Sequence, residues 1–259
     1  MSEEYILCID IGNTHTVLGI FNREKLKAHI RLNSGSYTTE DEIFVVFSNI
    51  CKQQLIDTAN ISGAIISSVV PEVTPIFSKM VSKYLATEPL EVSHSLDLGL
   101  VILYEDPSQV GADRLCNAVA GFNKYGGPIV IVDFGTATTF DCVSSNQEYL
   151  GGIIMPGIET ASIDLHRRAA KLPKVELTFP DKLIATNTVD SIRAGIMYST
   201  VDAVDGILSR LQQEMGPSTK MISTGGLASV IVEKSKYLEI IEPFMVLEGL
   251  RLLYQRLSE

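Results

Sequence analysis

The sequence has few of the features that mark membrane, secreted or nucleic-acid-binding proteins. Its 259 residues include no uninterrupted apolar run of about 18 residues, the length that a membrane-spanning helix requires. The first residues, Met1 to Glu4, are acidic where a secretory signal is basic, so we expect a cytoplasmic protein that binds no membrane. The net charge of −10 argues against a nucleic-acid binder, which needs a basic face. An anionic ligand must therefore be bound by local donors and by cations.

Cysteine and histidine are equally sparse, and two common nucleotide-binding motifs are missing. No C-x-x-C pair and no His/Cys cluster occurs in the sequence, so we predict buried thiols rather than disulfides or zinc ligands. The four cysteines are Cys8, Cys51, Cys116 and Cys142. Neither G-x-x-x-x-G-K-[ST] nor G-x-G-x-x-G is present, which argues against a P-loop kinase and a dinucleotide enzyme.

The stretch Ile6–Phe21 carries the clearest chemical pattern. An apolar run ends at Asp10, turns through Gly12 and polar residues, and resumes as a second apolar run, which predicts a β-hairpin. Gly12 allows a ligand to approach the backbone, and the amide and hydroxyl side chains after it can donate to phosphate oxygens. Asp10 would repel a phosphate unless a cation lay between them. An ordinary hairpin with a polar tip is the alternative for this stretch alone.

The same pattern recurs about half a chain later, in Ile129–Val143. There Asp133 ends an apolar strand, and a turn through Gly135 and Thr136 leads into a second strand. A local pattern repeated at this distance predicts two similar halves, each with one turn, and two such turns can hold one polyphosphate from both sides.

The domain organisation follows from this repeat. With 46% hydrophobic residues, the chain is long enough for two modest domains with their own cores or for one large domain, and the repeat favours two. We place them at residues 1–116 and 117–259. The amphipathic helix predicted over Phe244–Leu257 can pack back on the first domain.

A third cluster of candidate residues lies between the two turns. The tract Leu98–Arg114 ends in Asp113 and Arg114, just before a predicted helix over Leu115–Phe122. A carboxylate favoured by the helix dipole, beside a solvated arginine, is the simple interpretation. Because the second turn follows only one helix later, the functional interpretation places both side chains near the same site. The planar guanidinium of Arg114 suits a substrate carboxylate, and Asp113 can accept a proton from a hydroxyl.

The remaining sequence alternates between predicted strands and helices. The predicted strands are Lys25–Leu32, Gly63–Val70 and Tyr149–Gly157, and the predicted helices include one capped by Thr39 and Glu42, one over Thr74–Leu85, and one with a solvated basic face at His166, Arg167 and Arg168. Met221–Ser229 is interpreted as a strand and a Gly-Gly turn that suits an adenosine, with a simple helix-start turn as the alternative. Thr188 opens a long amphipathic helix that extends to Gln213.

Together these segments resemble the type III pantothenate kinases, within the acetate-kinase/Hsp70/actin superfamily. The motifs are Asp10-x-Gly-Asn-Thr-x-Thr, Tyr104-x-x-Pro-x-x-x-Gly-Ala-Asp-Arg114, Asp133-Phe-Gly-Thr-Ala-Thr-Thr, Gly151-Gly-x-Ile-x-Pro-Gly157, Asn187-Thr188 and Thr224-Gly-Gly, in the family's order over nearly the whole chain. Ala185 departs from the glycine that is frequent there. The resemblance implies an α/β fold of two similar RNase H-like/actin-like domains, each a mixed sheet flanked by helices, with an ATP cleft between them. It also implies ATP-dependent phosphorylation of the 4′-hydroxyl of pantothenate, the first step of coenzyme A biosynthesis.

The resemblance further implies roles for individual residues. Asp113 is the implied proton acceptor, and Asp133 is the implied ligand of a monovalent cation, K⁺ or NH₄⁺. Asp10 is the second predicted cation ligand, and Mg²⁺ is the divalent cation expected with ATP. The implied ATP-binding residues are Asp10, Ile11, Gly12, Asn13, Thr14, His15, Thr16, Val17 and Thr136, to which the Gly-Gly turn adds Thr224, Gly225 and Gly226. The implied pantothenate-binding residues are Tyr104, Gly111, Ala112, Asp113, Arg114 and Thr188.

Two alternatives stay open, and one expectation concerns assembly. Another kinase or phosphatase of the superfamily would share the turns but not the Tyr104–Arg114 tract. A non-catalytic regulator would lack Asp113 or one turn, or would carry an added DNA-binding segment. We also expect a homodimer with the pantothenate pocket near the subunit contact. The helix Thr188–Gln213 has more apolar positions than one domain obviously needs, although it can equally be the core helix of the second domain. These positions are Ile192, Ile196, Val201, Val204, Ile207 and Leu208.

Overall fold

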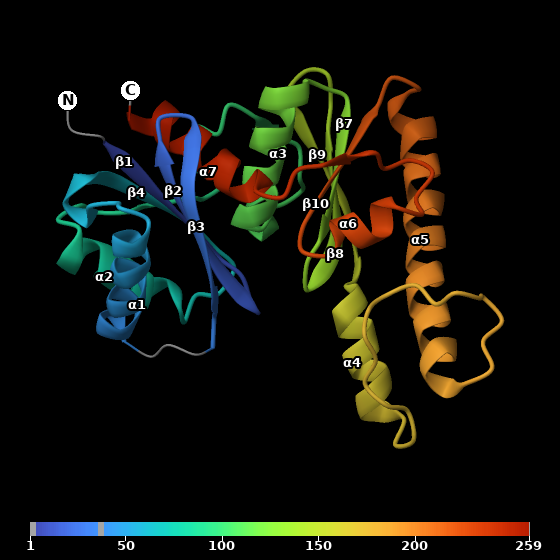
Figure 1. Cartoon of the computed structure of the whole chain (residues 1–259). Coiled ribbons are helices and arrows are strands. Elements are labelled where there is room, and N and C mark those ends of the chain that lie inside the picture. The colour runs from blue at the N-terminus through green and yellow to red at the C-terminus, as the bar shows by residue number, and fades with distance from the viewer. Residues whose placement is uncertain (1–3, 36–38, 259) are drawn as a thin grey trace. The chain divides into compact units, whose positions relative to one another are not determined.

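The computed structural model describes residues 4–35 and 39–258 of the chain. Contacts divide it into two compact units (Figure 1): one contains the residues up to Ala120 and those from Met245 onward, and the other is Gly121–Phe244. The boundary between the two units, after Ala120, falls inside helix α3 (Ala112–Tyr125). The domain boundary predicted from the sequence, between residues 116 and 117, falls inside the same helix. Each unit is an α/β layer structure in which helices pack against one mixed sheet.

The sheet of the first unit is built around the predicted hairpin. Its strands are β1 (Tyr5–Ile11), β2 (His15–Asn22), β3 (Lys25–Asn33), β4 (Ile61–Ser68) and β5 (Leu90–Glu91), in the order β3-β2-β1-β4-β5. The first three strands form an antiparallel meander, and β4 and β5 continue the sheet in parallel with β1. Short elements complete the connections: 3₁₀ turns at Thr58–Asn60 and Pro107–Gln109, and β6 (Val101–Ile102).

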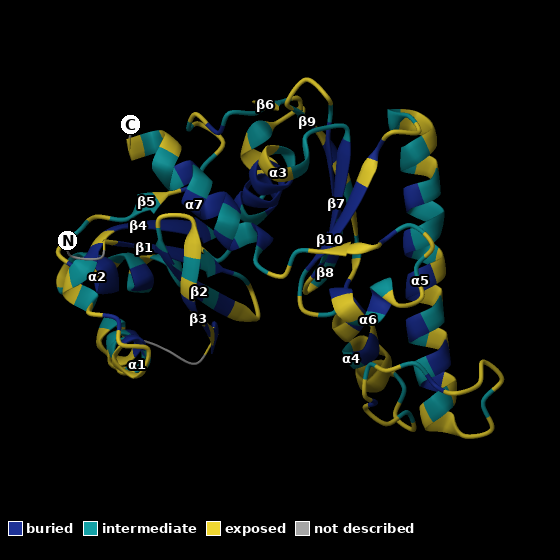
Figure 2. Cartoon of the chain, turned by 45° about the horizontal axis from the view of Figure 1, so that its top comes forward, coloured by how far each residue is buried: buried dark blue, intermediate teal, exposed yellow. Residues whose placement is uncertain are grey.

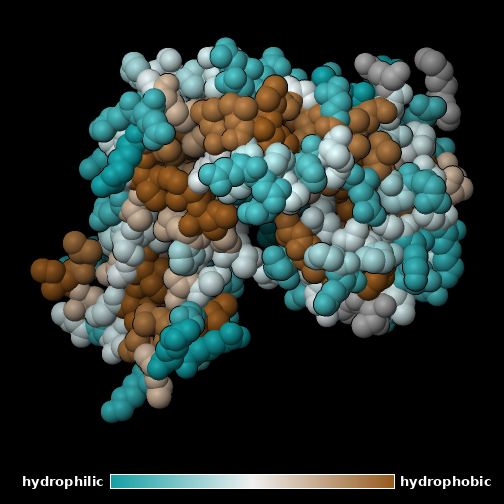
Figure 3. Space-filling view, turned by 180° about the vertical axis from the view of Figure 1, so that it is seen from behind, coloured by the Kyte–Doolittle hydropathy of each residue, from teal (hydrophilic) through white to brown (hydrophobic). Residues whose placement is uncertain are grey.

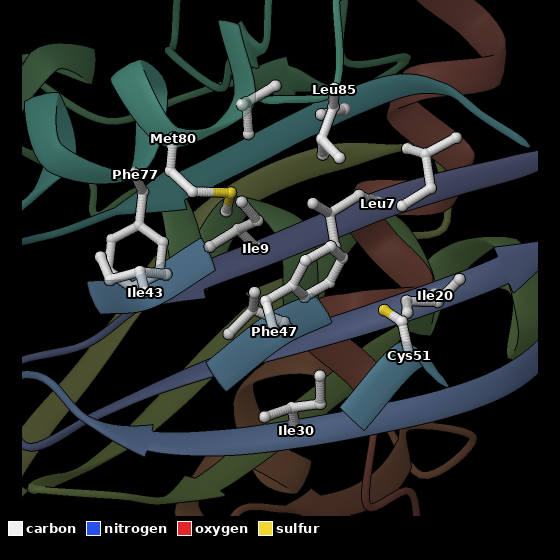
Figure 4. Packing of buried hydrophobic residues seen from close by; sticks show 14 of the residues in the cluster. Leu7, Ile9, Ile20, Ile30, Ile43, Phe47, Cys51, Phe77, Met80 and Leu85 are labelled. Carbon is white, nitrogen blue, oxygen red and sulfur yellow. The ribbon is translucent and has the colours of Figure 1, made fainter. Parts of the chain in front are cut away.

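Helices α1 (Glu40–Gln53) and α2 (Thr74–Tyr84) cover one face of this sheet. The capping box predicted for α1 is present: the Glu42 amide donates to the Thr39 hydroxyl at 3.3 Å, and the Thr39 amide donates to the Glu42 carboxylate at 3.1 Å. The core between helices and sheet is continuous (Figure 4). It includes Leu7, Ile9, Ile20 and Ile30 from the strands and Ile43, Phe47, Cys51, Phe77 and Met80 from the helices.

Helix α7 (Met245–Ser258) returns the chain to the first unit and packs on β1 and β4. The contact is close at two glycines. A Cβ on Gly63 of β4 would lie 1.7 Å from the Tyr254 hydroxyl, and a Cβ on Gly249 would lie 2.1 Å from the Cys116 carbonyl oxygen of α3. Any larger residue at either position would therefore push α7 away from the sheet or from α3.

The second unit repeats the sheet topology of the first. Its strands are β7 (Ile129–Phe134), β8 (Ala137–Val143), β9 (Glu148–Pro156), β10 (Lys220–Thr224) and β11 (Ile240–Ile241), in the order β9-β8-β7-β10-β11. Here too an antiparallel meander of three strands is extended by two strands parallel to its first member. The repeat predicted from the two Asp-x-Gly turns thus extends to this five-strand arrangement.

The helices of the second unit are α4 (Ile158–Arg168), α5 (Thr188–Met215) and α6 (Ala228–Val232). The apolar stripe of α5 faces the unit's own core, as its buried positions show (Figure 2). Val201, Val204 and Leu208 are buried in this core, and Ile196 and Ile207 pack against it. Most of the apolar stripe on this helix is therefore buried in the core of its own unit and does not by itself indicate a dimer.

Three further sequence expectations can be compared with the structure. All four cysteine thiols are buried, as predicted. The basic residues His166, Arg167 and Arg168 are exposed, as expected of a solvated helix face. Helix α3 begins at Ala112, three residues before the predicted start at Leu115, so Asp113 and Arg114 lie in its first turn.

Among residues 4–35 and 39–258, no helix has the length and apolar character needed to cross a bilayer.

Candidate functional site

The turn between β1 and β2 exposes the polar residues predicted to meet phosphates. Asn13, Thr14 and His15 are exposed, and the turn is closed by a hydrogen bond of 3.0 Å from the Gly12 amide to the His15 carbonyl oxygen. A Cβ on Gly12 would lie 3.0 Å from that same oxygen, so the tight closure favours glycine. The turn therefore presents backbone and short polar side chains to solvent.

The remaining residues of this motif lie within the sheet. Ile11 is part of the hydrophobic core, so it can offer a ligand only its backbone. Val17 is half-buried. Asp10 is half-buried at the end of β1 and pairs in register with Val17 on β2 and with Ser67 on β4.

Ser34 supports this turn and was not identified from the sequence. Its hydroxyl donates to the Gly12 carbonyl oxygen at 2.6 Å and shares a hydrogen bond of 2.9 Å with the buried Thr16 hydroxyl. Its amide donates to the Thr14 carbonyl oxygen at 3.1 Å. Thr16 thus directs its side chain toward Ser34, and its part in ATP binding stays a prediction. Because Ser34 follows β3, only the strand register could have indicated it.

The Asp113 carboxylate lies in a confined place at the start of α3. A Cβ on Gly111 would lie 2.5 Å from Asp113 Oδ1 and 3.3 Å from Val69 Cγ1, so glycine leaves the space that the carboxylate occupies. The Arg114 amide donates to Asp113 Oδ1 at 2.8 Å. Burial raises the pKa of Asp113 above its ordinary value, opposed by the Arg114 amide and guanidinium. A carboxylate with a raised pKa is a stronger base than one in water.

Asp10 and Asp113 lie in the same region of the first unit. Burial raises the pKa of the Cys116 thiol well above its usual value, and the charges of Asp10 and Asp113 raise it further. Direct contacts agree with this: the Val69 amide donates to the carbonyl oxygen of Ile11, the residue after Asp10, at 3.1 Å. A Cβ on Gly111, beside Asp113, would lie 3.3 Å from Val69 Cγ1. Arg114 and Ala112 are buried beside them, and Tyr104 is half-buried in the preceding loop. The sequence argument placed Asp113 and Arg114 by their distance from the second turn, and their roles stay predictions.

The turn between β7 and β8 has the same form in the second unit. Gly135 and Thr136 are exposed, and the Gly135 amide donates to the Ala137 carbonyl oxygen at 3.1 Å. The start of α4 fixes the turn, because the Gly157 amide and the Thr160 hydroxyl both donate to the Thr136 carbonyl oxygen, at 3.2 and 2.6 Å. Neither supporting residue was predicted to have this role.

Gly135 is not required by the packing of the protein itself. A Cβ there would lie 3.5 Å from the Ala137 carbonyl oxygen and 3.7 Å from Asp133 Oδ1, which are ordinary contacts. Since the fold has room for a side chain, the glycine leaves the turn open to a ligand. This fits the approach of a phosphate to the backbone.

The Gly-Gly turn after β10 packs directly against Asp133. Thr224 pairs in register with Asp133, and Gly225 has a positive φ of 91°. A Cβ on Gly225 would lie 2.5 Å from Asp133 Oδ1 and 2.6 Å from the Phe134 amide nitrogen. Thr224 is buried, whereas Gly226 is exposed. The structure therefore brings together Asp133, which the sequence assigned to a cation, and the Gly-Gly turn, which it assigned to ATP.

Thr188 lines a groove between α4 and α5, in the second unit. The groove has a volume of about 360 Å³, and its walls include Leu165, Ile192 and Ile196 as well as the hydroxyl residues Thr188 and Ser199. Apolar side chains gather on this part of the surface (Figure 3). A mostly apolar groove with a few hydroxyl groups suits a small organic molecule.

The candidate cation ligands are two separate carboxylates. In the part of the chain that the structure describes, no group of three or more His, Cys, Asp or Glu residues is arranged to hold a metal. Asp10 and Asp133 each stand at a strand end beside an open glycine turn. This arrangement suits Mg²⁺, which commonly takes one or two carboxylates and completes its shell with substrate phosphates and water.

A family model and two curated relatives agree on one family, and their matches cover most of the chain. Residues 6–210 match the family model described as type III pantothenate kinase. A type III pantothenate kinase from Moorella thermoacetica is 45% identical over 251 residues, which cover 97% of this chain and 99% of the relative. A type III pantothenate kinase from Bacillus cytotoxicus is 43% identical over 251 residues, 97% of this chain and 96% of the relative.

Solved structures share the fold at low sequence identity. A protein from Campylobacter jejuni, described as a conserved Baf family transcriptional activator, has a TM-score of 0.57 at 19% identity, with 97% of this chain and 98% of that chain covered. The ROK hexokinase from Thermus thermophilus has a TM-score of 0.52 at 11% identity, with 98% and 99% covered. These likenesses bear on the fold alone, which is the two-domain fold of the actin-like and ROK kinases.

Proposed function

Because this chain belongs to the type III pantothenate kinase family, we propose that it transfers a phosphoryl group from ATP to the 4′-hydroxyl of pantothenate, the first step of coenzyme A biosynthesis. The observation that carries the proposal is the pair of equivalent turns. Asp10 and Asp133 are the last residues but one of the equivalent strands β1 and β7, and each is followed after one residue by a glycine in an open turn.

The residues at these turns fit ATP and its Mg²⁺. We infer that the exposed Asn13, Thr14 and Thr136 donate to phosphate oxygens, and that Asp10 and Asp133 hold the cations that offset phosphate charge. The Gly-Gly turn beside Asp133 offers backbone to the adenosine. When bound, MgATP supplies the phosphoryl group. The protein's part in such a transfer is mainly to position the reactants and neutralise charge.

Asp113 is the residue that we assign to proton transfer. Its raised pKa and its place near Asp10 support a role as the base that accepts the proton of the pantothenate hydroxyl. Arg114, next to it in the first turn of α3, is assigned to the pantothenate carboxylate because its planar fork can bind both oxygens. Tyr104 and Gly111 from the same tract and Thr188 from α5 complete the proposed set.

Three finer features belong to the same proposal. Asp133 binds a monovalent cation such as K⁺ or NH₄⁺. The enzyme is a homodimer, for which the support is the exposed groove between α4 and α5 and its apolar residues, with Leu165 and Val189 exposed nearby. The reaction takes place in the cytoplasm, where ATP is available.

A coupled assay of ADP formation tests the activity. We expect ATP consumption that depends on pantothenate and a product heavier than pantothenate by one phosphate, identified by mass spectrometry. A panel of other hydroxylated acids and sugars is the control. ATP consumption that is independent of pantothenate, or greater with another substrate of the panel, would overturn the proposed function.

A further inference from the structure

Arg193 joins two parts of the second unit that are distant in sequence. Its Nε donates to the Thr178 carbonyl oxygen at 3.1 Å, and its Nη2 donates to the Phe179 carbonyl oxygen at 3.2 Å and to the Thr178 hydroxyl. Its Nη1 forms an ion pair of 2.8 Å with Asp190, one turn earlier on α5. One guanidinium therefore ties the segment before α5 to the first turns of that helix.

Asp190 links Arg193 to Asn187, the residue at the start of α5. Asn187 is the N-cap of α5, and its side-chain oxygen accepts from the Asp190 amide at 2.9 Å. Its side-chain nitrogen donates to Asp190 Oδ2 at 2.8 Å, while Asp190 Oδ1 is bound by Arg193. The three side chains at positions 187, 190 and 193 thus form one chain of contacts, and Thr188 is the first helical residue inside it.

The segment between the two attachment points is exposed. Leu183 and Ile184 are 65% and 86% exposed, so burial does little to hold residues 181–187 in place. On one side, Phe179 packs edge-on against Tyr198 of α5, with ring centroids 5.1 Å apart. On the other side lies the Asn187 cap. The aromatic contact and the Arg193 hydrogen bonds at one end, and the Asn187 cap at the other, therefore fix a segment that has little core of its own.

We propose that Arg193 is a positioning residue for pantothenate: through Asp190 and Asn187 it fixes the entry of the chain into α5 and so the place of Thr188 in the groove between α4 and α5. This inference rests on the proposed function. Arginine suits the task because its rigid fork donates to a carboxylate and to two carbonyl oxygens at once, which the single ammonium group of lysine does not reproduce.

The first experiment compares Arg193→Gln with Arg210→Gln as a matched control. Arg210 is an exposed arginine on the same helix that donates to the Gly206 carbonyl oxygen one turn away. For Arg193→Gln we expect the KM for pantothenate to rise about tenfold, the effect of losing a charge-assisted hydrogen bond, while kcat, the KM for ATP and the melting temperature stay close to wild type. Arg193→Lys should not restore the KM, and Arg210→Gln should change nothing.

Combination with Thr188→Ala tests whether Arg193 acts through Thr188. If Arg193 acts through Thr188, the Arg193→Gln substitution should raise the KM for pantothenate much less in the Thr188→Ala variant than in the wild-type protein. Fully additive effects would overturn the proposal. It would also be overturned if Arg193→Gln left the KM for pantothenate unchanged, or lowered kcat, melting temperature and both affinities together.

Limited proteolysis tests the clamp without reference to any substrate. Lys182 is exposed in the segment that the clamp holds, so trypsin should cleave after it several-fold faster in Arg193→Gln than in wild type or Arg210→Gln, as followed by mass spectrometry. Equal cleavage rates would overturn the clamp. A wild-type protein without pantothenate-dependent turnover would instead refute the proposed function, and the cleavage rates would still decide whether Arg193 fixes this segment.

Discussion

Replacing Gly225 by alanine tests whether the Gly-Gly turn holds Asp133 in place. Gly225 has a φ of 91°, and an added Cβ would lie 2.5 Å from Asp133 Oδ1 and 2.6 Å from the Phe134 amide nitrogen. Gly216 provides a matched control, because its φ is 102° but a Cβ there would meet nothing within 4 Å. Both variants introduce backbone strain, and only Gly225→Ala adds a clash.

The magnitudes separate the two effects. Placing alanine at a positive φ of this kind costs about 1–3 kcal/mol of folding free energy in either variant. The clash adds about 1–3 kcal/mol, because Phe134 is buried in a central strand and cannot move freely. At about 2–4 °C per kcal/mol, Gly225→Ala should melt roughly 2–12 °C below Gly216→Ala.

The kinetic arm of this test concerns Asp133 itself. If the new methyl group displaces the carboxylate, kcat falls and the KM for ATP rises in Gly225→Ala, whereas Gly216→Ala keeps wild-type kinetics. Calorimetry and the coupled assay give both measurements on the same preparations. Gly225→Ala and Gly216→Ala with equal melting temperatures and equal kinetics would refute the reasoning that the turn supports Asp133.

Three other variants test the proposed roles. Asp113→Asn should lower kcat by about 10²–10⁴-fold, the usual contribution of a positioned base, without lowering the melting temperature at neutral pH; normal turnover would refute the role. Burial raises the pKa of Asp113, so the charged carboxylate destabilises the fold at pH values above that pKa. Wild-type activity should fall as the pH drops through the pKa of Asp113, because the base becomes protonated. The pH profile of Asp113→Asn should lack this decrease. Asp133→Asn should reduce turnover and blunt activation by K⁺, and full wild-type activity in sodium-only buffer would exclude a specific monovalent site. Leu165→Asp, at the groove, should dissociate the dimer in sedimentation experiments and raise the KM for pantothenate; a fully active wild-type monomer would contradict the dimer.

The sheet elements could be predicted from the sequence because their signals are local. An apolar run, an Asp-x-Gly turn and a second apolar run define each hairpin without reference to the rest of the chain, and Thr39 and Glu42 define a capping box within one turn. The start of α3 was placed too late, at Leu115. The Gly111 carbonyl oxygen already accepts a helical hydrogen bond from the Leu115 amide, so the helix includes Asp113.

Contacts between distant residues could not be predicted in the same way. Ser34 reaches Gly12 across 22 positions, and Arg193 reaches Thr178 across 15, and nothing in the local pattern marks either residue. The apolar positions of α5 were recognised, but their partners were not. Whether such a stripe faces its own core or a second subunit depends on the sheet and helices around it, which one helix does not reveal.

The return of α7 to the first unit has a consequence for synthesis of the protein. The second unit is one continuous stretch, Gly121–Phe244, so it can fold as soon as it leaves the ribosome. The first unit is completed only later, because α7 packs on β1 and β4 and is made after the second unit. At about 5–20 residues per second the delay is roughly 6–25 s, during which apolar surface of the sheet stays open to chaperones or to other nascent chains.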